Sequence, residues 1–244
     1  MANRIDQVES FFAQPERYLS SNYNIRIRAE VVEGFVGGKM FRSILDIGCG
    51  NGAISLPLLR KDTQLTLLDI SSNMLSIANS RTPAEFSDNV ELINEDFMQA
   101  ALRLQSFDLI LCLGVLAHVD SPADVIARIA SLLKPGGSVI VQNSNSHHPV
   151  GYLFNLYSKL RNTLHPAPYT LNRLSDAKLM EMFDNQGLKL IALYRYSLPI
   201  PGMARFFTSD SIYKFLRKTY GTYPHNYRSW LGNEHIYYLK KDGG

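Results

Sequence analysis

The chain has 244 residues, the length of one large α/β domain or of one domain with a modest insertion. Hydrophobic residues make up 45% of it and charged residues 19%, so it can bury a core without disulfides or structural metals. The formal net charge of +3 is too small to indicate nucleic-acid binding. The two cysteines are too few for a disulfide framework and indicate a reducing compartment.

The chain is expected to be cytoplasmic. Its first residues, MANRIDQVESFF, carry spread charges and no long apolar core, so no signal peptide is indicated. No apolar run approaches the roughly 18 residues of a membrane span. Aromatic and basic residues interleave over 213–228. That stretch is either a packed helix with a basic rim or a surface for an anionic acceptor or a membrane, so peripheral membrane contact stays open.

In chain order, residues 1–42 are predicted to be helical, with an apolar stripe that Gly37-Gly38 ends. Strands and helices then alternate, which predicts a parallel sheet with right-handed crossovers. The first five strands are predicted at 43–47, 65–69, 90–94, 107–113 and 138–142. Helices are predicted over 56–59, 73–80 and 121–133, the last with Ser121 as its cap and Lys134-Pro135-Gly136-Gly137 as its end.

Two long connections interrupt this alternation after the fifth strand. Residues 143–172 are rich in Asn, His, Pro and Tyr, with a helical patch near 150–164, and residues 198–233 form the second connection. Long excursions of this kind are usually lids or binding elements. The remaining elements are a helix capped near Ser175 and ended by Gly187, and strands at 188–195 and 235–239.

A glycine-rich turn, residues 48–52, follows the first strand. Glycines let the backbone turn tightly and let a ligand approach without meeting a Cβ atom. Such a turn delivers the ligand to a helix N-terminus at the carboxyl end of a strand. Gly48, Gly50 and Ala53 also satisfy the dinucleotide pattern, so the turn alone indicates a nucleotide-type site. Cys49 is expected to be a small spacer, because nothing nearby marks it as a thiolate.

Three acidic residues stand at the ends of three successive strands. Asp46 precedes the glycines, where a carboxylate suits a cationic amino-acid group better than a pyrophosphate. Asp69, followed by Ile70, can accept both ribose hydroxyls, a feature shared with NAD enzymes. Asp96 can accept the exocyclic amine of adenine, with Phe97 beside the ring. Three acids without a basic cradle predict a nucleoside ligand that carries no phosphates.

Together these motifs resemble those of class I S-adenosylmethionine-dependent methyltransferases. LDIGCGNG, LTLLDISSNML, NEDF, FDLILCLGVLAHV and LLKPGG occur in the order and spacing of that family. The match covers about residues 24–143. Within the family, the chain most resembles the ubiquinone-biosynthesis O-methyltransferases and related small-molecule enzymes.

The resemblance implies S-adenosyl-L-methionine as the cofactor and places several residues at it. In that group an arginine on the helix before strand one contacts the cofactor carboxylate, and the same spacing points to Arg28 here. Leu113, at the end of the fourth strand, is expected to touch the cofactor, and Met74 to pack near the adenosine. The expected cofactor site comprises Arg28, Asp46, Gly48, Cys49, Gly50, Asp69, Ile70, Met74, Asp96, Phe97 and Leu113.

The chain departs from that group in having Ala117-His118 where Glu-His is common. A carboxylate tied to catalysis or metal use in the group is therefore missing, and no metal site is expected. His118 after strand four and His147 after strand five are candidate bases for an acceptor that must lose a proton. The alternative for His118 is a histidine that a backbone carbonyl holds in place.

The predicted fold is a Rossmann-like, seven-stranded, mostly parallel sheet with helices on both faces and helical insertions after strand five and before the last strand. We expect one domain, 1–244, with an N-terminal helical cap (1–42), a cofactor-binding core (43–143) and an acceptor-side half with lid-like insertions (144–244). The expected reaction is methyl transfer to an O or N nucleophile of a small-molecule acceptor, with no nucleic-acid partner. The alternatives are an NAD-type oxidoreductase and a cofactor-binding, non-catalytic partner protein.

Overall fold

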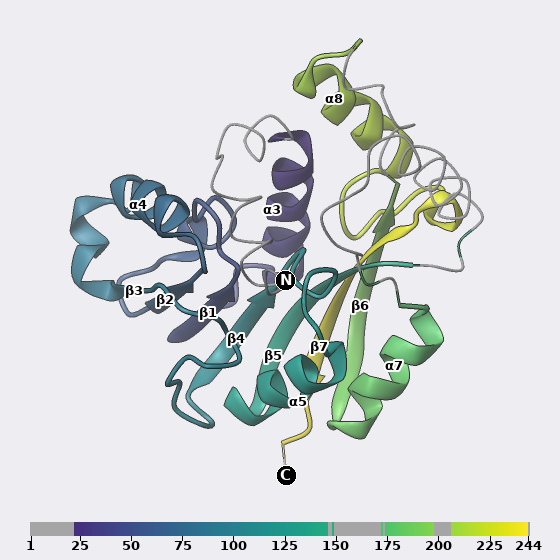
Figure 1. Ribbon diagram of the computed structural model, residues 1–244. Coiled ribbons are helices and arrows are strands. Elements are labelled where there is room, and N and C mark those ends of the chain that lie inside the picture. Colours follow the sequence, from purple (N-terminus) through teal and green to yellow (C-terminus); the bar gives the residue numbers. More distant parts are fainter. Residues whose placement is uncertain (1–21, 146–147, 149–171, 173, 198–205, 244) are drawn as a thin grey trace, which may run out of the picture.

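The structure is a computed structural model that describes residues 22–145, 148, 172, 174–197 and 206–243. Its centre is a seven-stranded sheet in the order β3-β2-β1-β4-β5-β7-β6 (Figure 1). The strands are β1 (Ser43–Ile47), β2 (Gln64–Leu68), β3 (Val90–Ile93), β4 (Phe107–Cys112), β5 (Leu133–Ser144), β6 (Leu188–Tyr196) and β7 (Glu234–Lys241). β7 runs antiparallel to both of its neighbours and the other pairs are parallel, which confirms the predicted sheet.

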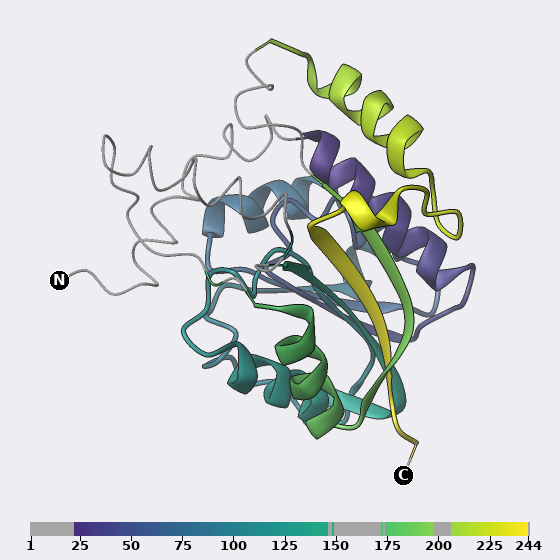
Figure 2. The same cartoon turned by 90° about the vertical axis from the view of Figure 1, so that its right-hand side faces the viewer.

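Helices cover both faces of this sheet. They are α3 (Asn22–Val36), α4 (Ser72–Arg81), α5 (Pro122–Leu132), α7 (Asp176–Asn185) and α8 (Ser209–Tyr220), with short 3-10 helices η1 (Leu56–Leu58), η2 (Ala84–Asn89) and η4 (Ser229–Leu231). Figure 2 shows α3 and α8 on one face and α5 and α7 on the other. Two separate apolar clusters fill the two layers, one under α3, α4 and α8 and the other under α5 and α7. The doubly covered sheet that the alternation predicts is therefore present.

Local signals place the ends of several helices as expected. The Ser121 hydroxyl accepts a hydrogen bond from the Asp124 N–H at 3.3 Å and caps α5. Ser175 caps α7 in the same way. Within the predicted N-terminal cap, α3 buries the apolar stripe, whereas residues 1–21 lie outside the described residues. The helical patch expected near 150–164 also lies outside them.

The prediction of a helix directly after the glycine turn is wrong. Residues 51–55 form turns, and Leu56–Leu58 form only the 3-10 helix η1. The Leu58 and Leu59 N–H groups donate to carbonyls three residues back, at 2.9 and 3.1 Å. Pro57 lies in the first turn of η1, where its missing N–H costs little. The turn therefore leads into loop backbone and not into the α-helix N-terminus that the pattern suggested.

The segment Lys134-Pro135-Gly136-Gly137 belongs to β5 and does not simply end the preceding helix. β5 begins at Leu133, where the pattern predicted Ser138. Leu133 pairs with Phe107 and Ser138 with Leu109, so four residues of β5 lie opposite one of β4. Gly136 takes up this irregularity with φ of +72°, a conformation that glycine adopts without strain.

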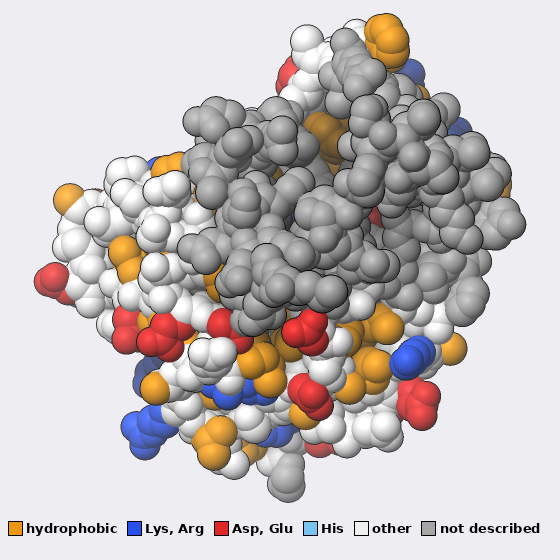
Figure 3. All heavy atoms as spheres, in the orientation of Figure 1, with side chains coloured by type: hydrophobic (Ala, Val, Ile, Leu, Met, Phe, Trp, Pro, Cys, Tyr) orange, Lys and Arg blue, Asp and Glu red, His pale blue; other side chains and the backbone are white. Residues whose placement is uncertain are grey.

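α8 packs against α3 through its inner side and exposes a mixed outer side. Tyr220 is buried, and Arg217 forms an ion pair with Glu30 of α3. On the outer side Phe215 is 55% exposed and lies next in sequence to Lys214. Figure 3 shows apolar side chains at the top of the molecule, over α8. The packed helix with a basic rim is thus observed, and contact of its outer side with a membrane or an anionic acceptor stays a prediction.

None of the described helices has the length and apolar character needed to cross a membrane.

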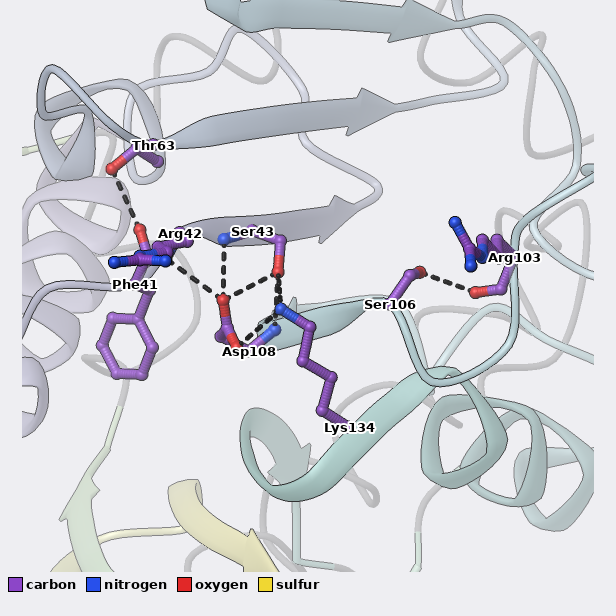
Figure 4. Close-up of polar contacts among 8 residues, drawn as sticks. All are labelled: Phe41, Arg42, Ser43, Thr63, Arg103, Ser106, Asp108 and Lys134. Carbon is purple, nitrogen blue, oxygen red and sulfur yellow. Dashed lines mark hydrogen bonds and ion pairs between the residues drawn. The ribbon is translucent and has the colours of Figure 1, made fainter.

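An ion-pair cluster joins three strands at their amino ends (Figure 4). Asp108 of β4 accepts from the Ser43 N–H and hydroxyl of β1 at 2.9 and 2.8 Å, and from the Lys134 ammonium of β5 at 2.9 Å. Burial by itself raises the pKa of Asp108, but the hydrogen bonds from Lys134 and Ser43 outweigh it and lower the pKa. The charged form of Asp108 therefore stabilises the fold at neutral pH, and this contribution is lost as the pH falls through the lowered pKa.

Replacing Asp108 by alanine is expected to lower the free energy of unfolding by about 1 to 3 kcal/mol, because the backbone and side-chain donors of Ser43 lose their partner. Urea unfolding at neutral pH measures this change. Asp88→Ala, at an exposed position, is the control and should change the free energy by less than about 0.5 kcal/mol. Equal stability of the two variants would contradict the assigned role of the cluster.

Candidate functional site

The glycine turn is fixed between the carboxyl ends of β1, β2 and β4. The N–H groups of Gly48 and Cys49 both donate to the Leu68 carbonyl, at 2.8 and 3.1 Å. Gly48 has φ of +65°, and a Cβ atom there would lie 2.6 Å from Cγ2 of Val115. Only glycine fits this position, because both the conformation and the space exclude a side chain. The turn therefore presents bare backbone at the carboxyl edge of the sheet.

Asp69 follows β2 and is held rigidly by the turn. Its Oδ2 accepts from the Gly50 N–H at 2.8 Å, and its Oδ1 accepts from the Ser71 N–H at 2.9 Å. The Asn94 amide holds the carbonyls of Asp69 and Ile70, at 3.0 and 2.9 Å. Burial raises the pKa of Asp69, although the backbone donors oppose the shift. Each carboxylate oxygen keeps acceptor capacity beyond its one backbone donor, which is what two neighbouring hydroxyl groups require.

Asp46, on β1 below the turn, is a second buried acid with a 4% exposed side chain. Burial raises its pKa to about 7, the nearby Ser55 hydroxyl opposes the shift, and the nearby charge of Asp69 adds to it. In the described part of the chain neither Asp46 nor Asp69 forms an ion pair. Two buried carboxylates without a cation make this edge a favourable place for a positively charged ligand group.

Arg28 of α3 brings a positive charge to the other side of the same edge. Its guanidinium packs on Gly114, where a Cβ atom would lie 3.2 Å from Nη2. Gly114 precedes Val115, which contacts the glycine turn at Gly48. The Arg28 Nε is buried and has no hydrogen-bond partner in the described structure. A buried donor without a partner is costly, so an acceptor supplied by a ligand would stabilise the site.

Leu113 and Met74 flank the turn as buried side chains, 7% and 1% exposed. In the first turn of α4, the Met74 N–H donates to the Ser71 hydroxyl at 3.4 Å. Burial, followed by the charges of Asp46 and Asp69, raises the pKa of the Cys49 thiol. The thiol therefore stays protonated, which agrees with Cys49 as a spacer. The contacts of these residues with a cofactor stay predictions.

Asp96 and Phe97 follow β3. The Oδ1 atom of Asp96 accepts from the Met98 N–H at 2.8 Å, which closes a tight turn. The Phe97 side chain is 5% exposed in the cluster under α5, and the Arg128 guanidinium lies 5.2 Å from its ring centroid. Most of the Phe97 ring is therefore buried by packing in the core. The expected contacts of Asp96 and Phe97 with an adenine stay predictions.

His118 lies half-buried in the loop after β4, and its N–H donates to the Val115 carbonyl at 2.8 Å. The sequence did not single out Asn172, which secures this loop. The Asn172 N–H donates to the Ala117 carbonyl at 2.8 Å, and its side-chain amide donates to the carbonyls of Leu116 and Val119. The second candidate base, His147, lies outside the described residues.

A buried polar cluster lies between α3 and the sheet, next to Arg28, and sequence patterns did not reveal it. It consists of Asn24, Gln142, Ser144, Tyr196 and Glu234. The acidic residue Glu234 is only 7% exposed, and its only signal in the sequence is a lone acid just before the predicted last strand. The cluster extends the polar edge of the site from β4 across β5, β7 and β6.

The family of methyltransferase domains matches residues 42–187, and the chain belongs to this family. The resemblance to S-adenosylmethionine-dependent methyltransferases, and S-adenosylmethionine as the cofactor, are thereby confirmed. The ubiquinone biosynthesis O-methyltransferase of Saccharophagus degradans is 35% identical over 139 residues, which are 56% of this chain and 53% of the relative. The chain thus spans about half the length of the curated relatives that it matches.

Solved structures share the fold over nearly the whole chain. A Thermotoga maritima protein, described as a possible histamine N-methyltransferase, has a TM-score of 0.67 at 17% identity and covers 98% of this chain and 100% of its own. The magnesium protoporphyrin IX methyltransferase of Synechocystis, solved with bound S-adenosylhomocysteine, has a TM-score of 0.67 at 15% identity, with 98% and 100% covered. At these identities the likeness shows the fold alone.

Proposed function

We propose that this chain transfers a methyl group from S-adenosylmethionine to an O or N nucleophile of a small-molecule acceptor. The arrangement of charge around the glycine turn carries the proposal. Two buried carboxylates, Asp46 and Asp69, lie on one side, and Arg28 lies on the other with a buried Nε that has no partner among the described residues. These groups fit a nucleoside with an amino-acid arm, which bears a carboxylate and a positive charge, better than they fit a phosphate.

Each of these residues has one expected task. Asp69 would accept the ribose hydroxyls, because backbone donors already fix both of its oxygens. Arg28 would bind the carboxylate of the amino-acid arm through its free donors. Asp46 would favour the positively charged part of the cofactor, and Asp96 would accept the adenine amine. When bound, S-adenosylmethionine supplies a methyl group that its sulfonium already makes electrophilic. The chain then has to align the acceptor and exclude water.

Acceptors with either oxygen or nitrogen nucleophiles agree with the relatives. The Saccharophagus relative is named an O-methyltransferase, and the Thermotoga neighbour is described as a possible N-methyltransferase. A phenol or an alcohol must lose a proton on methylation, whereas a neutral amine can react without a base. The nature of the acceptor therefore decides whether His118 or His147 has a catalytic role.

Methyl transfer is tested by incubating the protein with S-adenosylmethionine labelled at its methyl group and a fractionated metabolite extract. Transfer of label to an extract component is the expected result, and that product identifies the acceptor. Thermal shift with S-adenosylhomocysteine and with NADH separates the methyltransferase from an NAD-type oxidoreductase. Stabilisation by NADH alone would overturn the proposal. Binding of S-adenosylhomocysteine without label transfer to any fraction would instead favour the non-catalytic binding protein.

If the labelled product is an ether or an ester, His118→Ala combined with His147→Ala is expected to lower kcat by about 100- to 10,000-fold, the range of general base catalysis. If the product is a methylated amine, kcat should change little. Steady-state kinetics with the identified acceptor measure the effect. His225→Ala, at an exposed position, is the control. Wild-type turnover of an O-acceptor by the double variant would exclude both histidines as bases.

A further inference from the structure

Asn172 holds the loop that follows β4 through three hydrogen bonds to the loop backbone. Its own N–H donates to the Ala117 carbonyl at 2.8 Å. Its side-chain amide donates to the Leu116 carbonyl at 3.3 Å and to the Val119 carbonyl. These three carbonyls lie on both sides of His118, so a single asparagine fixes the backbone around this candidate base.

Asn172 is itself held in place, because the residues after it are tied to the sheet and to α7. The buried Asn143 side chain, near the end of β5, donates from its amide to the Leu174 carbonyl at 3.0 Å. The Ser175 hydroxyl accepts from the Lys178 N–H at 3.3 Å and caps α7. The Asn172 amide therefore donates from a fixed position toward the loop.

The loop that Asn172 holds contacts both of the charged sides of the site. At its start, Gly114 packs on the Arg28 guanidinium, where a Cβ atom would lie 3.2 Å from Nη2. The next residue, Val115, packs on the glycine turn so closely that a Cβ atom on Gly48 would lie 2.6 Å from its Cγ2. A shift of the loop would therefore change its contacts with the arginine and with the glycine turn together.

A loop that has to be ordered when a ligand binds lowers the affinity, because fixing its backbone has an entropic cost. We propose that Asn172 is a positioning residue for the cofactor. It holds residues 114–119 in place before S-adenosylmethionine binds, so that Arg28 and the glycine turn keep the spacing that the cofactor requires. The effect passes through three backbone carbonyls and needs no contact between Asn172 and the ligand. This inference rests on the proposed function.

The first test is Asn172→Ala, which removes both side-chain hydrogen bonds and keeps the backbone N–H. Without ligand, hydrogen exchange in residues 115–119 should be faster than in wild type, and S-adenosylhomocysteine should restore the protection because it orders the loop. Isothermal titration calorimetry should show that the variant binds S-adenosylhomocysteine about fivefold or more weakly, which corresponds to ordering one backbone residue.

Asn172→Asp separates hydrogen bonding from packing. It keeps the size of the side chain but replaces the amide donor with a carboxylate, which only accepts and is repelled by the Leu116 and Val119 carbonyls. Asn172→Asp should therefore bind S-adenosylhomocysteine more weakly than Asn172→Ala does. A role in packing alone predicts the reverse order, with Asn172→Asp close to wild type. If Asn172→Ala does not fold, Asn172→Ser keeps one donor and should show the same changes at a smaller size.

Asn226 provides the matched control. It is likewise half-buried, and its side-chain amide donates to two backbone carbonyls, those of Arg195 in β6 at 2.9 Å and of Tyr220 in α8 at 3.2 Å. Asn226→Ala removes the same kind of hydrogen bonds from a different part of the chain. It should lower the midpoint of thermal unfolding as Asn172→Ala does, but its affinity for S-adenosylhomocysteine should stay within about twofold of wild type.

The outcomes separate this inference from the proposed function. Tight wild-type binding of S-adenosylhomocysteine that Asn172→Ala leaves unchanged, or unchanged exchange in residues 115–119, would overturn only the role of Asn172. An equal loss of affinity in Asn172→Ala and Asn226→Ala would reveal a general effect of stability and would also overturn that role. Failure of wild-type protein to bind S-adenosylhomocysteine would overturn the proposed function and, with it, the role of Asn172 at the cofactor.

Discussion

Replacing Asp69 by alanine is expected to weaken the binding of S-adenosylhomocysteine by about two to four orders of magnitude. Two hydrogen bonds to a charged carboxylate are lost, each contributing about 1.5 to 3 kcal/mol, and about 1.4 kcal/mol corresponds to tenfold in affinity. The backbone donors of Gly50 and Ser71 also lose the acceptor that fixes the turn. Isothermal titration calorimetry measures the change in Kd.

The effect should depend on the carboxylate and not on a general loss of folding. Asp69→Asn keeps one acceptor oxygen, so its affinity should lie between those of wild type and Asp69→Ala. Asp96→Ala should have a smaller effect, because Asp96 is expected to make one contact with the adenine. Thermal unfolding of each variant without ligand controls for stability. Affinity of Asp69→Ala within a few-fold of wild type would remove Asp69 from the site.

The second large effect is a pH dependence of cofactor binding that arises from Asp46. Its pKa lies at about 7 in the unliganded protein, far above the ordinary value of 3.8. A positively charged ligand group favours the ionised carboxylate, so ligand binding should release a proton near neutral pH. Because only about a tenth of a group with this pKa is ionised one pH unit below it, the Kd should fall about tenfold from pH 6 to pH 8 and then level off.

Asp46→Asn should flatten this profile, because the amide does not titrate. Calorimetry in two buffers with different ionisation enthalpies counts the proton released by the wild type near pH 7. The stability of the unliganded protein should show the opposite sign. The folded state holds the Asp46 proton more tightly than the unfolded chain, so stability falls as the pH rises from about 4 to about 7. A Kd that is independent of pH in the wild type would show that Asp46 does not interact with the charge of the ligand.

Features that depend on neighbouring residues were well predicted from the sequence. The glycine turn, the acids at the strand ends and the cap of α5 each depend on residues within a few positions of one another. The order of strands and helices follows from hydrophobic periodicity, which also predicted the stripe that α3 buries. The sequence predictions were wrong at the ends of some elements, where the local pattern did not reveal strand pairing or the type of helix. Leu133 belongs to β5 because it pairs with Phe107, and only the 3-10 helix η1 forms where a helix was expected.

The sequence by itself thus determined the class of sheet, the family and the acidic edge that suits a nucleoside without phosphates. Only the tertiary structure decided which polar groups meet in the buried cluster between α3 and the sheet. Its hydrogen bonds join Tyr196 to Asn24 across 172 residues and Gln142 to Glu234 across 92. These groups meet because β7 inserts between β5 and β6 and α3 packs on the same face. No periodicity encodes such a meeting, since burial and hydrogen bonding at this range depend on strand order and not on local spacing.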